Sequence, residues 1–289
     1  MRLGYACMNV TLQSKMRTCR LATVEKEGME KVKELTLHNL SQVLSILKWN
    51  VENDILFFRV SSDIVPFGSH PVLTWDWWTD KDVLFITNEI FLLQEQYKMR
   101  LSMHPGQYTI LNSPNPKVVK NAIAELEYHN TLMELIGAKD MIIHTGGAYG
   151  DKVSAIGRFI EQYDGLSESI KEKLRIENDD KVFDAEDVLT ISAQCGVSVC
   201  FDIHHHYCNH AKLENTAGLI QRVIQTWEGR GIPKMHISSG KTSKTDHAHH
   251  DYILEEDFHS FVQLLDGNDV DIMVEAKKKE LAVLRLKGE

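Results

Sequence analysis

The stretch Val197–His206 reads VSVCFDIHHH, and its character changes halfway along. The first part is a run of β-branched and apolar residues, which predicts a strand that is buried on both faces. The run then ends in Asp202, Ile203 and three consecutive histidines. A carboxylate and imidazoles brought to one place are costly to bury in an apolar core and well suited to binding a metal ion. A solvated, histidine-rich turn is the alternative interpretation of the same residues.

Short strand-like runs alternate with longer helical runs on both sides of this stretch. We expect strands at Arg2–Met8, Ile55–Ser61, Arg100–His104, Met141–His144, Leu174–Glu177, Val197–Ile203, Lys234–Ser238 and Asp271–Glu275. We expect helices at Met29–Asn50, Val83–Tyr97, Pro116–Leu135, Val153–Tyr163, Ala185–Gln194, Ala217–Trp227 and Ile253–Leu265, with a last helix from Lys278. The polar, irregular segment Thr11–Gly28 predicts a long loop.

This alternation predicts parallel strands that are joined by crossover helices. Eight such units within 289 residues indicate a closed (β/α)₈ barrel, formed as one domain over residues 1–289. An open, doubly wound sheet is the alternative. A dinucleotide-binding fold gains no support, because no GxGxxG motif follows a strand.

The composition is that of a globular protein with a substantial core, since 43% of the residues are hydrophobic. No apolar run approaches the ~20 residues that cross a bilayer, and the first residues, MRLGYACMN, lack the apolar segment of a signal peptide. We therefore expect a cytoplasmic protein. Five cysteines without a CxxC pair predict reduced thiols, of which Cys208 is close enough to the histidine run to be a further candidate ligand.

The formal net charge of −9 argues against binding nucleic acid through a broad basic surface. It does not exclude a nuclease, because carboxylates gathered around metal ions add negative charge that the bound cations reverse locally. Composition therefore leaves the partner open. Nothing in it indicates an obligate oligomer, and a monomer is the default expectation.

Metal-binding residue types lie at the ends of six of the predicted strands. In a parallel barrel these ends meet at one rim, where the loops build the active site. So many polar and like-charged groups need cations between them. The residues that converge in this way are His104, His144, Glu177, Asp202, His205, Lys234, His236, His249 in the loop behind the seventh strand, and Glu275.

Eight nitrogen and oxygen donors exceed what one ion uses, and they indicate about three metal ions that share bridging carboxylates. Glu177, in the middle of the series, is the natural bridge. Without a thiolate, the set favours Mn²⁺ or another divalent ion such as Zn²⁺ or Mg²⁺. Sites of this kind typically hydrolyse phosphodiesters, because one ion generates hydroxide while the others neutralise the phosphate and the leaving oxygen.

Eight motifs, spread from the first strand to the last, together resemble those of the UV damage endonucleases, which are similar to the endonuclease IV group of barrel nucleases. The resemblance implies recognition of cyclobutane pyrimidine dimers and 6-4 photoproducts in duplex DNA, with incision immediately 5′ to the lesion. It also implies a trinuclear site that usually holds manganese. The motifs are RLGYACMN, IVPFGSHP, LSMHPGQY, HTGGAYG, RIEND, FDIHHH, PKMHIS and VEAK.

The resemblance assigns roles residue by residue. It implies the metal ligands His104, His144, Glu177, Asp202, His205, His236, His249 and Glu275. Lys234 matches a lysine that the family can carry in carboxylated form near the metals, and His70 matches a histidine close to the reacting phosphate. Gln107 and Tyr108 match a pair that probes the duplex at the lesion, and Tyr5 and Asn9 match positions near the damaged bases.

For some residues the sequence allows more than one role. His247 or His250 is an alternative to His249, whereas in the other histidine run only His205 lies three residues after Asp202. Two interpretations apply to Trp75, Trp77 and Trp78: they are exposed and stack on bases, or they are buried in a small hydrophobic core within the loop. Five basic residues in rim loops are candidates for phosphate contacts, with solvated surface charge as the alternative, namely Lys15, Arg17, Arg20, Lys241 and Lys244.

Two further functions compete with a repair endonuclease. A metal-dependent sugar isomerase or epimerase uses a similar barrel, but it generally needs fewer ions and a small closed pocket. A non-catalytic metal- or DNA-binding protein has no use for bridged hydrolytic metals. The projecting pair Gln107 and Tyr108, which follows a Pro-Gly turn, favours an enzyme that acts on a duplex.

Overall fold

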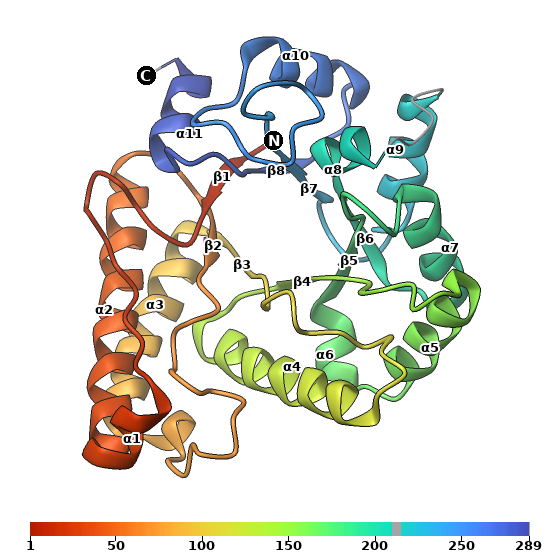
Figure 1. Ribbon diagram of the computed structural model, residues 1–289. Coiled ribbons are helices and arrows are strands. Elements are labelled where there is room, and N and C mark those ends of the chain that lie inside the picture. The colour runs from red at the N-terminus through yellow and green to blue at the C-terminus, as the bar shows by residue number, and fades with distance from the viewer. Residues whose placement is uncertain (210–214, 289) are drawn as a thin grey trace.

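The structure is a computed structural model in which residues 1–209 and 215–288 are described. Its centre is a closed barrel of parallel strands that follow one another in sequence order (Figure 1). β1 pairs with β8 as well as with β2, so the predicted (β/α)₈ barrel is confirmed and an open sheet is excluded. The strands are β1 (Leu3–Ala6), β2 (Phe57–Val60), β3 (Arg100–Met103), β4 (Asp140–His144), β5 (Leu174–Glu177), β6 (Ser198–Asp202), β7 (Lys234–Ile237) and β8 (Asp271–Val274).

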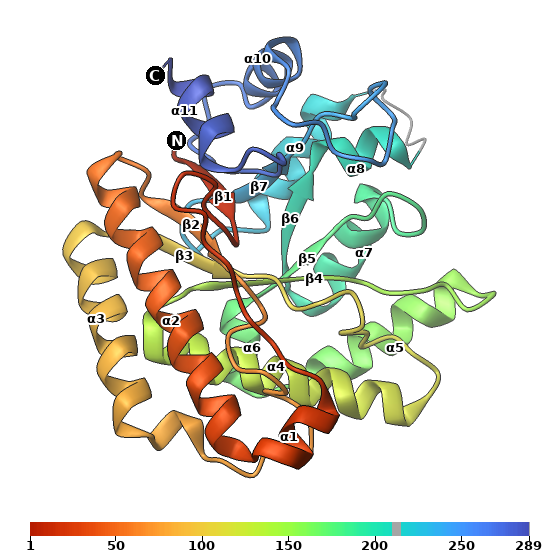
Figure 2. The same cartoon turned by 60° about the vertical axis from the view of Figure 1, so that its left-hand side comes forward.

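Helices surround the barrel, and the long helices α2, α3 and α4 form one flank of the molecule (Figures 1 and 2). No described helix has the length and apolar character of a membrane span. The α-helices are α1 (Leu21–Glu27), α2 (Met29–Glu52), α3 (Lys81–Tyr97), α4 (Pro116–Ile136), α5 (Lys152–Asp164), α6 (Glu168–Lys173), α7 (Ala185–Cys195), α8 (Ile203–Cys208), α9 (Thr216–Gln225), α10 (Glu255–Leu264) and α11 (Glu280–Lys287), with a 3₁₀ turn η1 at Trp77–Thr79.

Three short helices were not predicted from the sequence. α1 interrupts the segment that we expected to be a loop, α6 precedes β5, and α8 follows β6. These helices have six or seven residues, too few to show a helical period clearly. α8 begins because the Asp202 side chain accepts a hydrogen bond from the backbone N–H of His205 at 2.8 Å, which is an N-cap. The predicted strand Val197–Ile203 therefore ends at Asp202, and the three histidines lie on a helix.

The strands alternate between two faces, and the two faces differ in chemistry. Outward-facing residues such as Leu101, Ile143 and Val199 join the large apolar core beneath the helices. The barrel interior is mostly polar. Its floor holds an ion network in which the Arg100 guanidinium contacts Asp140 at 2.8 Å and Asp271 at 3.0 Å. Buried polar side chains are stable only when they are paired, so the interior depends on this complementary charge.

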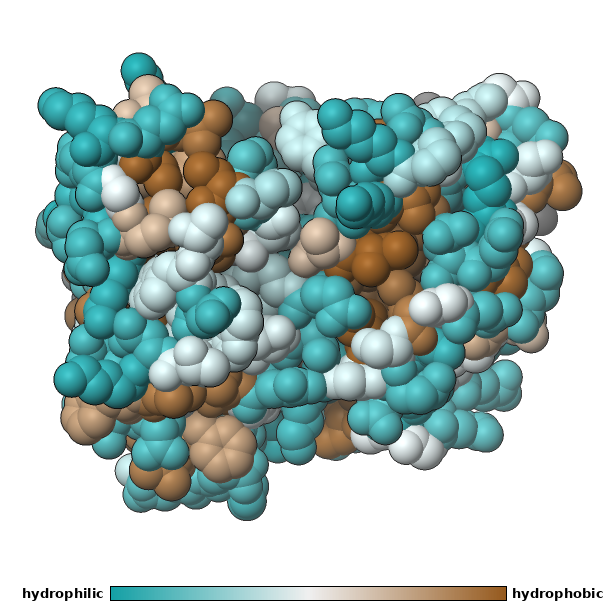
Figure 3. Space-filling model, turned by 90° about the horizontal axis from the view of Figure 1, so that it is seen from below, coloured by the Kyte–Doolittle hydropathy of each residue, from teal (hydrophilic) through white to brown (hydrophobic). Residues whose placement is uncertain are grey.

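The polar residues of the interior are stacked in layers along the barrel axis, because alternate residues of a strand face the same side. On β3, Arg100 lies at the floor, Ser102 above it and His104 just past the strand end. β4 and β8 likewise begin with a carboxylate at the floor, Asp140 and Asp271, and lead to His144 and Glu275 at the rim, whereas Ala6, Phe57 and Met273 form a small apolar cluster of their own. Seen from below in the orientation of Figure 1, the outer surface is mostly hydrophilic, with hydrophobic atoms gathered in separate patches (Figure 3).

Candidate metal centre

Glu177 is the centre of the rim site. It closes β5, it is 1% exposed, and each of its carboxylate oxygens contacts a different histidine. Oε2 lies 3.0 Å from Nε2 of His104, and Oε1 lies 2.9 Å from Nδ1 of His236. The barrel register accounts for this convergence, because it places His144 opposite Glu177 and His236 opposite Asp202 on neighbouring strands.

The other predicted ligands surround this carboxylate. Nε2 of His144 lies 3.8 Å from Oε2 of Glu177, and Nδ1 of His205 lies 3.5 Å from Oε1. Glu275 reaches the same place from β8, with its Oε1 3.3 Å from Nδ1 of His236. Seven of the eight predicted ligands therefore meet at one end of the barrel. Two sets of possible ligand atoms lie within 4.8 Å of one another, namely His104, His144 and Glu177, and Glu177, Asp202 and His236.

Glu177, His144 and His236 have the protonation states that metal binding requires, whereas His205 does not. Burial by itself raises the pKa of Glu177, but the adjacent His236 and His144 and the hydrogen bonds from neighbouring imidazoles outweigh it and hold this pKa well below its usual range. Burial lowers the pKa values of His144 and His236, which favours the neutral imidazole. Burial also acts to lower the pKa of His205, but the carboxylates of Asp202, Glu177 and Glu275 together raise it to about 9. A metal ion would displace that proton on binding.

Several buried atoms of the site have no hydrogen-bond partner among the described residues. They are Nδ1 of His144, Oδ2 of Asp202 and Nε2 of His236. An unpaired buried acceptor is costly, and native proteins rarely leave one without a reason. A divalent cation would satisfy such atoms, and mixed imidazole and carboxylate donors suit Mn²⁺ and Zn²⁺. The residues present therefore fit a divalent metal centre.

His249 is the predicted ligand that the structure leaves apart from this cluster. Its ring lies edge-on to that of His204, with centroids 5.7 Å apart, and no contact joins it to Glu177 within the described ranges. Its two alternatives are engaged elsewhere, because His247 pairs with Asp180 and Nδ1 of His250 accepts the backbone N–H of Tyr252 at 3.0 Å. The assignment of His249 as a ligand stays a prediction.

The helical turn of α8 directs the side chains of His204, His205 and His206 toward different neighbours. His205 faces Glu177, whereas Nε2 of His204 contacts the carbonyl oxygen of Asp246 at 3.0 Å. The ring of His206 packs against Phe201. The Cys208 thiol lies 3.6 Å from Nε2 of His204 and belongs to neither group of clustered ligand atoms.

Lys234 lies one layer below the metal-binding rim. Its side chain is fully buried, and Nζ donates a hydrogen bond to Oγ of Ser102 at 3.0 Å. Burial lowers the pKa of Lys234 from 10.5 to about 8. A lysine with this pKa is a better nucleophile and proton acceptor near neutral pH than a solvated one.

The residues predicted to touch DNA fall into two groups. Gln107 and Tyr108 follow β3 on an exposed turn, and the Tyr108 side chain is 79% exposed. Tyr5 and Asn9 are buried instead, because the Tyr5 hydroxyl donates to Oδ1 of Asn50 at 2.6 Å and accepts from Nδ2 of Asn9 at 2.8 Å. A side chain without exposed surface offers no contact area to a ligand in this conformation, and the roles of Tyr5 and Asn9 near the damaged bases stay a prediction.

His70 is exposed in the loop after β2, where its Nδ1 accepts the backbone N–H of Val72 at 3.1 Å. Within residues 1–209 and 215–288 no contact links it to Glu177, and its phosphate role stays a prediction. Among the tryptophans of the same loop, Trp77 is buried against Tyr128 and Trp78 is exposed.

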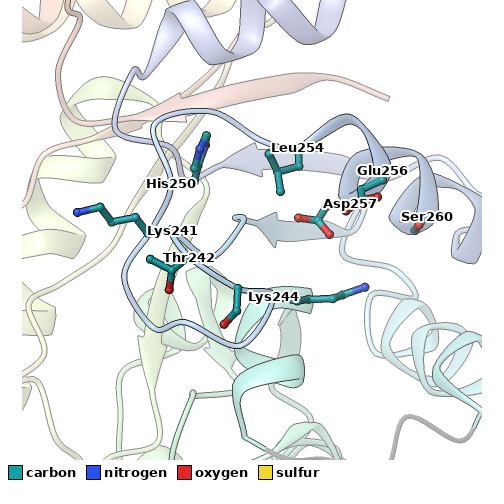
Figure 4. A pocket seen from close by; sticks show the side chains of 10 residues that line it. Lys241, Thr242, Lys244, His250, Leu254, Glu256, Asp257 and Ser260 are labelled. Carbon is teal, nitrogen blue, oxygen red and sulfur yellow. The ribbon is translucent and has the colours of Figure 1, made fainter.

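The basic rim residues Lys15, Arg17, Arg20, Lys241 and Lys244 lie at or near the surface. Lys241 and Lys244 line a hollow between the β7 loop and α10, together with Asp257 and Glu256. Figure 4 shows the side chains of the two lysines extending in opposite directions from the loop. The Lys244 amino group lies 4.0 Å from the centroid of the Tyr207 ring, and the phosphate contacts of both lysines stay a prediction.

Two residues of the site were missed from the sequence. Arg59 on β2 forms an ion pair with Glu275, and the Asn178 side chain binds both backbone groups of Asp202 at 2.9 Å. The negative charge of Glu275 raises the pKa of Arg59 despite burial, so the guanidinium stays charged. A charged residue within the apolar strand segment ILFFRV was the available signal for Arg59.

A parallel (β/α)₈ barrel with histidines and carboxylates clustered at its carboxyl rim defines a class of barrel enzymes that includes nucleases and sugar epimerases. Comparison with known proteins distinguishes between them. The model of the UV-endonuclease UvdE family matches residues 1–289, and the chain belongs to this family. The family is one of DNA-repair nucleases.

Individual relatives agree with this assignment. The UV DNA damage endonuclease of Bacillus pumilus is 36% identical over 300 residues, which cover 99% of this chain and 92% of the relative. The crystal structure of SacUVDE is 35% identical and superposes with a TM-score of 0.90, covering 100% of this chain and 98% of the other. Endonuclease IV from Thermus thermophilus has a TM-score of 0.63 at 14% identity, covering 100% and 98%, and shares the fold.

Proposed function

We propose that this protein is a metal-dependent endonuclease for UV photoproducts, which hydrolyses the phosphodiester immediately 5′ to a cyclobutane pyrimidine dimer or a 6-4 photoproduct in duplex DNA. The observation that carries the proposal is the convergence of six further donor side chains on Glu177, three of which have a buried polar atom without a hydrogen-bond partner among the described residues. We propose about three divalent ions there, with Mn²⁺ as the usual metal. We further propose that the enzyme acts as a monomer in the cytoplasm.

The bound ions would supply a hydroxide near neutral pH and neutralise charge on the phosphate. His104, His144 and Glu177 would hold one ion, and Glu177, Asp202 and His236 a second, so that Glu177 bridges them. His205, Glu275 and His249 complete the proposed donor set. Asn178 orients Asp202 through its backbone, and Arg59 orients Glu275, which limits the freedom of both carboxylates.

Residues at the edge of the site would recognise the damaged duplex. The exposed pair Gln107 and Tyr108 is proposed to fill the stack from which the damaged bases are displaced. Photoproducts weaken stacking, so the cost of displacing bases is lowest at the lesion, and selectivity follows without a base-specific contact. His70 is proposed to stabilise the reacting phosphate, and Lys234 to act beside the metals, in free or carboxylated form.

The test is a nick-mapping assay on a duplex with one defined photoproduct, incubated with the protein and Mn²⁺. We expect a single cut immediately 5′ to the lesion. Glu177→Gln should abolish the cut, because it removes the charge that the ligands share. The matched control is Glu186→Gln, which alters an exposed carboxylate paired with Arg222 on the outer helices and should cut normally.

Metal content provides an independent check. Elemental analysis should find about three divalent ions per chain in the unaltered protein and fewer in the Glu177→Gln variant, while circular dichroism shows both to be folded. An intact duplex together with ketose–aldose turnover would point to an epimerase instead. Tight binding of damaged DNA without cleavage would point to a non-catalytic binding protein.

A further inference from the structure

Tyr149 combines a rare backbone conformation with an exposed aromatic side chain. It lies in the connection between β4 and α5, five residues after His144, and therefore at the same rim as the metal centre. Its φ is +52°, in the left-handed region that side chains other than glycine rarely adopt. Its side chain is nevertheless 48% exposed. Such conformations persist where the surroundings impose them, and they cluster at binding sites.

The surroundings of Tyr149 do impose this conformation. Its ring packs against the Arg158 guanidinium, with CZ 5.7 Å from the ring centroid. Nε of Arg158 donates to the carbonyl oxygen of Asn112 at 2.8 Å, and Nδ2 of Asn112 donates to the carbonyl oxygen of Gly147 at 2.9 Å. The loops after β3 and β4 are thus tied together through one asparagine.

Gly146 shows how closely these two loops approach each other. Its φ is +114°, and a Cβ at this position would lie 2.4 Å from Oδ1 of Asn112. The connection is therefore built as a stiff support, and in Figure 2 it projects outward from the body of the barrel toward the start of α5. A side chain fixed on such a support loses little conformational entropy when it binds a partner.

The neighbouring loop presents the same chemistry. Tyr108 lies four residues after His104 and is the most exposed of the described tyrosines. β3 and β4 are adjacent strands, so both tyrosines belong to one sector of the rim. Proteins that hold nucleic-acid strands without reading their sequence combine aromatic rings, on which bases stack, with basic side chains for the backbone. The terminal nitrogens of Arg158 have no hydrogen-bond partner among residues 1–209 and 215–288; the guanidinium acts electrostatically on the carboxylate of Asp151, whose pKa it helps to lower, and it can also pair with a phosphate.

On the basis of the proposed function, we propose that Tyr149 and Arg158 form a second contact with the substrate DNA, beside the lesion. In this contact the Tyr149 ring packs on a base or sugar of the strand, and the Arg158 guanidinium pairs with a backbone phosphate. The ligand class is a nucleic-acid strand rather than a small sugar, which fits an endonuclease and not an epimerase. Neither residue touches the metal ligands, so the contact should affect binding more than chemistry.

The decisive variant is Tyr149→Gly, because glycine adopts a positive φ without strain. If the ring serves DNA binding, this variant should keep or raise the melting temperature while its Kd for a photoproduct duplex increases about 5- to 100-fold. Binding of the metal-loaded protein is measured by fluorescence anisotropy on a duplex that carries a nuclease-resistant linkage 5′ to the lesion, so that cleavage does not interfere. Tyr149→Phe should bind within about twofold of the unaltered protein, because it keeps the stacking face. Arg158→Met should weaken binding and reduce the slope of log K against log salt by about one.

The matched control is Tyr97→Ala. Tyr97 is a 38% exposed tyrosine at the end of α3, before β3 and hence at the opposite end of the barrel, and its loss should leave Kd unchanged. Unaltered DNA affinity in Tyr149→Gly, or a loss of stability that parallels the loss of affinity, would overturn the proposal. If the unaltered protein itself neither binds nor cuts the damaged duplex, the proposed function fails instead, and the two failures are thereby distinguished.

Discussion

Replacing Asp140 with asparagine tests whether the floor of the barrel supplies stability separately from the chemistry at the rim. Asp140 is buried between two guanidinium groups, with Arg100 at 2.8 Å and Arg175 at 3.2 Å. Asp271 supplies the second negative charge through its contact with Arg100 at 3.0 Å. These four residues form a neutral cluster. The variant Asp140→Asn leaves one buried positive charge without compensation.

The magnitude follows from this arrangement. Breaking a buried ion pair by removing one partner costs about 3–5 kcal/mol. For a chain of 289 residues the entropy of unfolding is about 0.6 kcal/mol per kelvin, so the melting temperature should fall by about 5–8 °C. The pKa of Asp140 points the same way. Burial raises this pKa, but Arg100 and Arg175 outweigh burial and lower it below its ordinary value of 3.8. The stabilisation is therefore present above pH 3.8 and is lost as the pH falls through the lower folded-state value.

The assay is urea and thermal unfolding of the metal-free protein, followed by nick mapping with Mn²⁺ below the transition. We expect reduced stability with an unchanged kcat, because Asp140 lies at the end of the barrel opposite to Glu177. Glu186→Gln, which removes an exposed ion pair, should shift the melting temperature by less than about 2 °C. A drop of similar size in the control, or a fall in kcat for folded Asp140→Asn, would refute the separation of floor and rim.

Three further predictions concern the interior, the rim loops and the metal. Because burial lowers the pKa of Lys234 from 10.5 to about 8, the unfolded chain holds this proton more tightly and the stability of metal-free protein should rise between pH 8 and pH 10.5. Lys234→Met should remove that rise. Below pH 8 it should also stabilise the protein by about 1–2 kcal/mol, after allowance for the lost hydrogen bond to Ser102, while activity is lost. Urea unfolding at pH 7 and at pH 10.5 checks the two stability predictions. Gly146→Ala should distort the loop against Asn112 and weaken DNA binding more than about fivefold, as measured by anisotropy, and intact affinity would show that the loop adapts. Chelation of bound metal should lower the melting temperature in calorimetry by several degrees, and added Mn²⁺ should restore it. The reason is that ions that bind only the folded rim stabilise the folded protein. An unchanged melting temperature would argue against resident metal.

Much of the site is visible in the sequence because its signals are local. β4, β5 and β6 each end in a histidine or a carboxylate, and His104 directly follows β3; parallel strands in a barrel place such ends at one rim. The sequence signals that predict helix ends are equally local. Pro116 begins α4 behind the N-cap Asn115, and Gly137 ends it with φ at +73°. These features need no knowledge of distant residues.

Other features depend on residues far apart in the chain, and the sequence could not supply them. Arg59 and Glu275 are 216 positions apart, and only the closure of β8 against β1 and β2 brings them together. The burial of Tyr5 is decided by its hydrogen bond to Asn50 on α2, which no motif around Tyr5 contains.

The sequence by itself determined the barrel, the order of its strands and the residue types at its rim. The reason is that the alternation of side chains along a strand and the polar residue at its end both depend on a few consecutive residues. The tertiary structure decided which donors face each other. His205 meets Glu177 while His204 and His206 turn away, because Asp202 starts a helix there and successive residues of a helix point about 100° apart. Side-chain direction follows from the packing of the whole chain, and for that reason the composition of the site was predictable while its geometry was not.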